Sequence, residues 1–249
     1  MILFAFGSAT AQNGNFRFGF QASPTLTWLD SDNKFINSNG TNLGLRLGMR
    51  GDYFLGNSGK YALTSGIGFA FNQGGTLLHD RGGNLLSKSE LSSETLRILP
   101  DMVEIKYSVR YIEVPVGLLM LTDQIFRDFR FFFNVPYLTF GFKSQAIGDI
   151  MGASATGQNS EDENIIKDVN ALHLTWGIGG GAEYNVRGNS KGDTNIYLGI
   201  FYNQGFTDIT DNKATTYIAR DELGNPTEVE EEDSRGTIRG ITLQFGVMF

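Results

Sequence analysis

The sequence predicts an all-β fold, a transmembrane antiparallel up-and-down β-barrel of about eight strands. Large apolar side chains alternate with small or polar ones along most of the chain, which is the pattern of strands with two different faces. Short and long connections follow one another between these alternating segments. No segment approaches the roughly 18 consecutive apolar residues of a membrane-spanning helix. These observations favour a barrel with short periplasmic turns and long extracellular loops.

The composition of the chain excludes several classes of protein. Of the 249 residues, 32 are glycine and 20 are phenylalanine, and none is cysteine. The formal net charge is −7, and no cluster of lysine and arginine supplies the basic face that nucleic acid requires. The absence of cysteine removes disulfide frameworks and thiolate sites. We therefore expect no nucleic-acid partner.

The amino terminus has the form of a remnant of an export signal. Residues Met1 to Ala11 are mostly apolar and end in Ala9-Thr10-Ala11, the small-x-small pattern that signal peptidase cleaves. We interpret residues 1–11 as the remnant of a signal peptide and residues 12–249 as a single barrel domain.

The strand segments with the clearest alternation also indicate which face is apolar. Between Asn15 and Trp28 the large apolar residues occupy even positions, and the chain ends in a further alternating segment from Ile241 to Phe249. Similar segments cover 43–49, 63–71, 172–186 and 196–202. The residues that we expect to face lipid, each on the apolar side of such a segment, are Leu45, Phe69, Trp176, Leu198 and Leu243.

Two further segments, Val103 to Leu121 and Phe129 to Ile147, alternate less regularly. In the first, polar side chains from Lys106 to Arg110 share a face with the apolar side chains from Ile112 to Val116. A bulge near Tyr111 would explain this change, and so would a strand that leaves the membrane at its outer end. The sequence leaves both explanations open.

The connections divide into two classes, as expected when both termini are periplasmic. Long polar connections cover Asp30 to Asn42, Gly74 to Met102, Gly148 to Asn170 and Asp208 to Gly236. Short connections cover Gly56 to Lys60, Thr122 to Asp128 and Arg187 to Thr194. The acidic runs from Glu161 to Glu163 and from Glu228 to Asp233 both fall in long connections, which we expect to be extracellular.

The less apolar face of the strands is better suited to the interior of the barrel. A soluble barrel would have to crowd the large apolar residues into one interior, whereas a narrow lumen accepts glycines, hydroxyls and a few paired charges. An interior this narrow should not form a pore. We expect a network of lumen charges, with Glu113 paired to Arg46 or Arg50; the members of this network are Arg17, Arg46, Arg50, Glu113 and Glu183.

No motif in the sequence predicts a cofactor, a metal ion or a catalytic group. Gly177 to Ala182 matches the dinucleotide pattern G-x-G-x-x-A, but no helix follows to receive a pyrophosphate. His79 and His173 lack the spacing of a metal site. His173 would act as a base only with a serine or aspartate nearby. The acidic loops have ligands for calcium or cation-bridged lipopolysaccharide, although a solvated acidic loop is the simpler interpretation.

Three segments in order resemble a known family. Tyr111-Ile-Glu-Val-Pro-Val116 resembles a Tyr-Leu-Glu-Ile-Pro-Leu stretch of the PorT-like outer-membrane β-barrel proteins of the Bacteroidetes. Gly177 to Tyr184 is similar to that family's Gly-x-Gly-Ala-Gly-x-Glu-Tyr strand, and Asn203 to Ile209 to its Asn-Asn-Gly-Phe-Thr-Asn-Ile segment. The resemblance implies an outer-membrane barrel, and some relatives serve type IX secretion. It brings no catalytic residues.

These observations favour a non-enzymatic barrel in the outer membrane of a Gram-negative bacterium. We expect it to act through its loops and its partners, with lipid and lipopolysaccharide around it and other envelope or secretion proteins as candidates. A role in type IX secretion or envelope assembly is implied by the resemblance alone. Two alternatives are an outer-membrane enzyme with an active site at the barrel rim and a soluble lipocalin-like carrier.

Overall fold

The computed structural model describes residues 15–56, 58–125, 128–153, 159–186, 194–211, 214–221, 226–232 and 234–249. The proposed signal-peptide remnant, Met1 to Ala11, lies outside the described residues, as do parts of the short connections 122–128 and 187–194. Eight long strands form the barrel: β1 (Phe16–Ser31), β2 (Ile36–Phe54), β3 (Tyr61–His79), β5 (Val103–Leu121), β6 (Phe129–Met151), β8 (Leu172–Val186), β9 (Thr194–Gly205) and β12 (Gly236–Met248).

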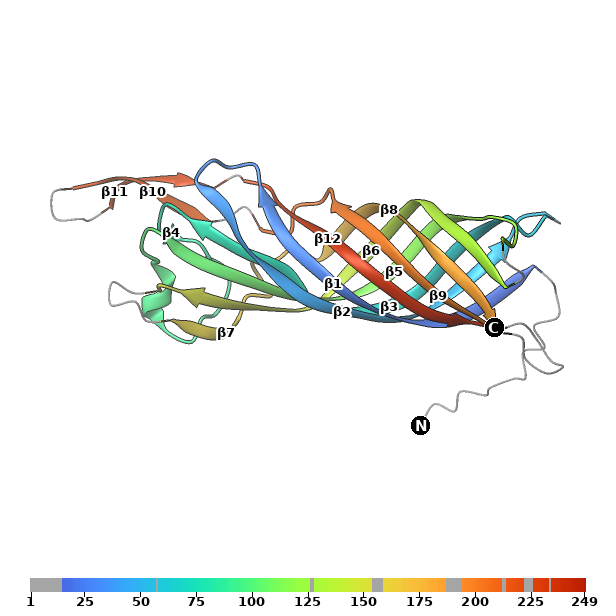
Figure 1. Ribbon diagram of the computed structural model, residues 1–249. Helices are drawn as coiled ribbons and strands as arrows, with labels where there is room; N and C mark the ends of the chain where they lie inside the picture. The colour runs from blue at the N-terminus through green and yellow to red at the C-terminus, as the bar shows by residue number, and fades with distance from the viewer. Residues whose placement is uncertain are drawn as a thin grey trace, which may run out of the picture.

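The eight long strands close on themselves. Each of them pairs in antiparallel fashion with the long strands before and after it in the chain, and the circle closes where β1 pairs with β12. Figure 1 shows the resulting cylinder, with strands running obliquely around it. The predicted fold, a transmembrane antiparallel up-and-down barrel, is confirmed. Among the described residues, no helix is long and apolar enough to cross a membrane.

Several strands are much longer than a membrane crossing requires. A tilted transmembrane strand needs about 9–11 residues, whereas β2, β3 and β5 have 19 residues each and β6 has 23. The prediction of a long loop from Asp30 to Asn42 is therefore wrong, because β2 begins at Ile36 and leaves only residues 32–35 as the connection. The loops predicted from Gly74 and Gly148 also start later, since β3 continues to His79 and β6 to Met151. The polar residues there are strand residues above the membrane.

The remaining elements gather at the end of the barrel opposite the start of β1 and the C-terminus (Figure 1). They are β4 (Gly83–Asn84), the short 3-10 helix η1 (Glu94–Arg97), β7 (Ser160–Asn164), β10 (Thr215–Arg220) and β11 (Pro226–Glu231). β7 extends the barrel sheet at β6, whereas β11, β10 and β4 form a separate three-stranded sheet. We call this end, together with the outer ends of the long strands, the head.

The position of β5, partly in the membrane and partly in the head, explains why its sequence alternates irregularly. Its side chains alternate between buried and more exposed without interruption from Val103 to Leu121. The outward side chains are polar up to Arg110 and apolar from Ile112 onward, so the strand leaves the membrane between these residues. Bulges do occur at this level, but the register shifts involve the flanking strands, between Ala70 and Gln73 of β3 and opposite Arg110 and Tyr111 on β6.

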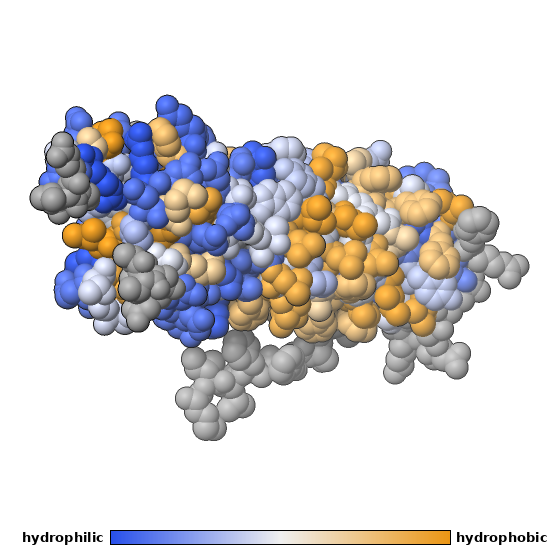
Figure 2. All heavy atoms as spheres, turned by 60° about the vertical axis from the view of Figure 1, so that its left-hand side comes forward, coloured by the Kyte–Doolittle hydropathy of each residue, from blue (hydrophilic) through white to orange (hydrophobic). Residues whose placement is uncertain are grey.

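The head has the reverse distribution of apolar side chains from the part of the barrel below it. In water the hydrophobic effect drives apolar groups inward, whereas in lipid the exterior can be apolar. Figure 2 accordingly shows a mostly apolar surface over the barrel and a mostly hydrophilic one over the head. The expectation of a polar interior therefore fails in the head. Its interior, the outer core, is a buried apolar cluster: Leu29, Ile36, Ala70, Leu77, Leu85, Leu86, Leu96, Leu99, Val103, Ile105, Tyr107, Val109, Tyr111, Ala146, Ile150, Ala153, Ile165, Val169, Ile209, Ala214 and Ile238.

Candidate functional site

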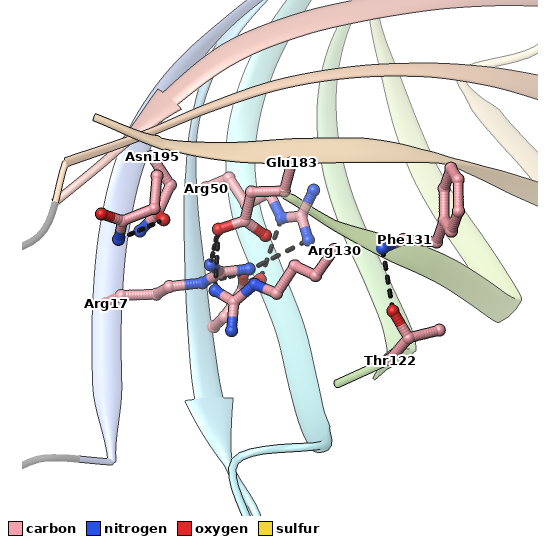
Figure 3. A network of polar contacts seen from close by, with 9 residues as sticks. Arg17, Arg50, Thr122, Arg130, Phe131, Glu183 and Asn195 are labelled. Carbon is pink, nitrogen blue, oxygen red and sulfur yellow. Dashed lines mark hydrogen bonds and ion pairs between the residues drawn. The ribbon is translucent and has the colours of Figure 1, made fainter. Parts of the chain in front are cut away.

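The lumen near the short turns holds a connected group of charged side chains (Figure 3). Arg17 of β1 donates from Nε to Oδ2 of Asp52 at 2.9 Å and also pairs with Glu183 of β8. Arg50 donates from Nε to Oδ1 of Asp52 at 2.9 Å. Arg130 of β6 reaches the same Glu183 carboxylate at 2.8 Å. Four strands are thereby tied together across the lumen.

A second ion pair lies farther along the lumen. Nε of Arg46 on β2 lies 3.1 Å from Oε2 of Glu113 on β5, and β3 separates these two strands in the sheet. Arg46 also donates from a terminal nitrogen to Oγ1 of Thr242 at 2.9 Å. Of the two arginines that the sequence offered to Glu113, the structure places Arg46 beside it, whereas Arg50 pairs with Asp52. The five predicted charges thus form two groups.

Sequence reasoning missed two members of the first group, Asp52 and Arg130. Asp52 lies two residues after Arg50, so it occupies the same inward face, and this spacing was visible in the sequence. Arg130 lies between Phe129 and Phe131, which point outward, so its inward direction also follows from alternation. Neither was predicted, because the first lies at the end of its alternating segment and the second in an irregular one.

The five residues predicted to face lipid all occupy the outer face of the barrel. Leu45 is 39% exposed, Phe69 51%, Trp176 46% and Leu198 49%. Leu243 is half-buried on the same face of β12, between the exposed residues Ile241 and Phe245. Together with the other exposed apolar side chains of the barrel, these residues form an apolar outer surface, which we call the belt. Figure 2 shows one face of this surface.

The two histidines lie in different environments, and both are buried. The ring of His173 lies 5.2 Å from that of Tyr111, and its Nδ1 is 3.4 Å from Oγ1 of Thr207. Neither neighbour is a carboxylate, so these contacts do not build a catalytic triad around His173. His79 lies at the outer end of β3, in the head, where burial lowers its pKa to about 4. The described residues contain no group of three or more His, Asp or Glu side chains placed to hold a metal ion.

The glycine-rich segment Gly177 to Ala182 is not a nucleotide-binding turn. It lies within β8, and the strand continues beyond it to Val186. A Cβ atom at Gly179 would overlap the ring of Phe201 on the neighbouring strand. The glycine therefore makes room for an aromatic side chain in the lumen.

Buried carboxylates hold the long connections of the head in place. Asp168 accepts the backbone N–H groups of Lys88 at 3.0 Å and of Ser89 at 2.9 Å, which joins two connections distant in sequence. Glu163 similarly accepts the N–H of Ser92 at 2.8 Å. Burial would raise the pKa of Glu163, but hydrogen bonds from Ser160 and Ser92 hold it below its usual value. The described parts of these long connections are therefore joined to one another rather than independent.

A comparison of the sequence with known families identifies the family of the chain, and the result agrees with the closed barrel described above. The family described as outer membrane protein β-barrel domain matches residues 10–211. The chain belongs to this family. It is thus an outer-membrane β-barrel protein of a Gram-negative bacterium, and the alternative of a soluble lipocalin-like carrier is wrong. No curated protein matches the chain significantly.

Solved structures of outer-membrane barrels are similar to the chain in fold. Neisserial surface protein A is 12% identical with a TM-score of 0.40, and the match covers 93% of this chain and 95% of that one. Ail, the attachment invasion locus protein of Yersinia pestis, is 11% identical with a TM-score of 0.37, covering 94% and 99%. The outer membrane protease OmpT of Escherichia coli is 12% identical with a TM-score of 0.37, covering 94% and 95%.

Proposed function

We propose that the protein is a non-enzymatic outer-membrane anchor that presents its head to a partner at the cell surface. The observation that carries this proposal is the construction of the head, in which long strands continue past the belt and close around an apolar core. Loops that only joined strands would need no such core. A head with a packed core and a hydrophilic surface, carried on a membrane anchor, is suited to binding.

The filled lumen supports binding over transport. Ion pairs cross the lumen at two levels, and the outer core occupies the interior of the head. The cavity beside Arg46 and Glu113 has a volume of about 20 Å³, which is room for about one water molecule. We therefore expect no conductance when the protein is reconstituted in a planar bilayer.

The kind of partner is suggested by the PorT-like segments. They lie in β5, in β8 and across the end of β9, so the resemblance covers barrel strands as well as the start of a long connection. We propose that the partner is another protein of the envelope, in secretion or in envelope assembly, and that lipid and lipopolysaccharide surround the belt. The support for secretion is family analogy.

The hairpin of β10 and β11 offers the sharpest test of the proposed function. All six residues of β11 are exposed, including Glu228 and Glu230. Affinity purification from native outer membranes should recover an envelope protein with the parent chain. The double variant Glu228→Lys and Glu230→Lys should recover less of it, since charge reversal at an interface suppresses association.

A matched control separates the hairpin from the rest of the surface. Asp123 is an exposed acid in a short turn at the opposite end of the barrel, 80% exposed in its side chain. The variant Asp123→Lys should recover the partner as the parent does. Equal recovery of the partner with the parent, the double variant and Asp123→Lys would contradict binding through this hairpin. If no protein partner is recovered with the parent, the proposed function itself is wrong.

A further inference from the structure

A cavity of about 390 Å³ lies at the rim of the head. One wall consists of residues 33–35 of the connection between β1 and β2, Ile36 at the start of β2, His79 at the end of β3 and Arg81 just after it. The other wall is the hairpin, which contributes Thr216 of β10 and residues 230–232 of β11 and its end. Binding sites for small molecules commonly have volumes of about 300–1,000 Å³. The cavity is therefore large enough for a small ligand.

The buried side chain of His79 lines this cavity. It is 4% exposed, and neither Nδ1 nor Nε2 has a hydrogen-bond partner among the described residues. A buried polar group without a partner costs free energy, so native proteins usually supply one from the chain, from water or from a ligand. Because His79 lines the cavity, a bound ligand can supply the hydrogen bonds that the described residues do not.

The two walls of the cavity carry opposite charges. On the first wall, the Lys34 ammonium lies 4.7 Å and the Arg81 guanidinium 3.6 Å from the centre of the Phe35 ring, which positions both cations. The second wall carries Glu230 and Glu231. In the part of the chain that the structure describes, no ion pair joins the cations of one wall to these two carboxylates. Both kinds of charge are left available to a ligand.

We propose that this cavity binds a small zwitterion of the size of a dipeptide. The ligand's ammonium group would lie toward Glu230 and Glu231, and its carboxylate toward Lys34 and Arg81. The peptide group between the two ends would meet His79. A neutral imidazole has one N–H donor and one nitrogen acceptor, which matches the acceptor and donor of an amide.

The two histidines of the chain make a direct measurement possible. In protein labelled with ¹⁵N-histidine and held in detergent micelles, titration with L-alanyl-L-alanine should shift the ring signals of His79 with saturation. His173 serves as the internal reference, because it lies in the lumen against Tyr111, and its signals should stay constant. Constant signals from both rings would overturn the proposal.

Variants and a second probe test the assigned charges. Arg81→Gln and Glu230→Gln should each weaken binding of the dipeptide about tenfold, as expected for the loss of one charge-assisted contact. Lys60→Gln, in a turn at the other end of the barrel, should bind the dipeptide as the parent does. N-acetyl-alanyl-alanine amide, which lacks both charges, should bind more weakly than the free dipeptide. Equal binding of the two probes, or unchanged binding by both cavity variants, would show that the zwitterion assignment is wrong.

Discussion

Arg46 of β2 and Glu113 of β5 form an ion pair across the lumen, with 3.1 Å between Nε and Oε2. Their side chains are 14% and 8% exposed. Removal of one partner from a buried pair leaves an uncompensated charge, which typically costs about 3–5 kcal/mol. We expect Glu113→Gln to lower the free energy of unfolding by about this amount, as measured by urea unfolding in detergent micelles.

The coupling between the two residues is measured by a double-mutant cycle. The variant that carries both Glu113→Gln and Arg46→Gln should lose less stability than the sum of the two single variants. The pair of Lys60 and Asp123 is a control, because its side chains are 44% and 80% exposed and such pairs contribute about 1 kcal/mol or less. Additive effects of Glu113→Gln and Arg46→Gln would show that the two residues do not stabilise each other.

The belt predicts where a new charge is tolerated. Leu198→Arg and Leu243→Arg place a guanidinium on the outer face of β9 and β12, and a charge near the middle of a bilayer costs a barrel roughly 2–4 kcal/mol. Ser38→Arg places the same group on an exposed position of β2 in the head, where it lies in water. Folding into phospholipid bilayers should be impaired in the first two variants and normal in the third. Normal folding of all three would mean that the belt does not face lipid.

The sequence predicted the part of the barrel at the level of the belt well. There the apolar side chains of each strand face lipid and the polar ones face the lumen, as alternation within a membrane requires. Alternation assigns residues to two faces but does not say which face points inward. In β5, Ile105 and Glu113 both point inward, although one is apolar and the other is charged. Their difference follows from position relative to the membrane, and the sequence pattern alone left that position undetermined. The head was consequently interpreted as long loops.

Alternation predicted which charged side chains point into the lumen, but it did not predict which of them pair with one another. Arg17 and Glu183 are 166 positions apart, and they meet only because closure of the barrel brings β1 and β8 to facing parts of the wall. Such contacts depend on the register of every strand pair between them. The cavity beside His79 was not predicted for a similar reason, since one wall comes from residues 33–36, 79 and 81 and the other from the hairpin, more than 130 positions later.

If the outer core stabilises the head, substitutions at two neighbouring residues of β5 should differ in their effect on stability. Ile105 is fully buried in the head, whereas its neighbour Lys106 points outward and pairs with Asp149 at 3.2 Å. Ile105→Ala should cost about 2–5 kcal/mol, because it removes apolar contacts and leaves a cavity. Lys106→Ala should cost about 1 kcal/mol or less. Urea unfolding of both variants decides this, and an equal small loss would contradict a packed apolar head.

The lowered pKa of His79 leads to a prediction about the stability of the head in acid. Burial lowers its pKa from 6.5 to about 4, so in the folded state it stays neutral where a solvated histidine is protonated. Above the unfolded pKa the ring is neutral in both states and adds no pH dependence. Between the two pKa values the unfolded state binds a proton that the folded state does not, so stability falls as the pH falls. Below about pH 4 both states are protonated, and the loss levels off.

The difference between the two pKa values corresponds to a loss of about 3 kcal/mol. His79→Gln removes the titrating group, and His173 and the carboxylates are present in both chains, so their contributions cancel. The free energy of unfolding in urea, measured from about pH 7 to about pH 4, should therefore fall more steeply for the parent than for His79→Gln. Parallel curves would mean that the folded head lets His79 take up a proton near its ordinary pKa, and hence that the imidazole is solvated rather than buried without a partner.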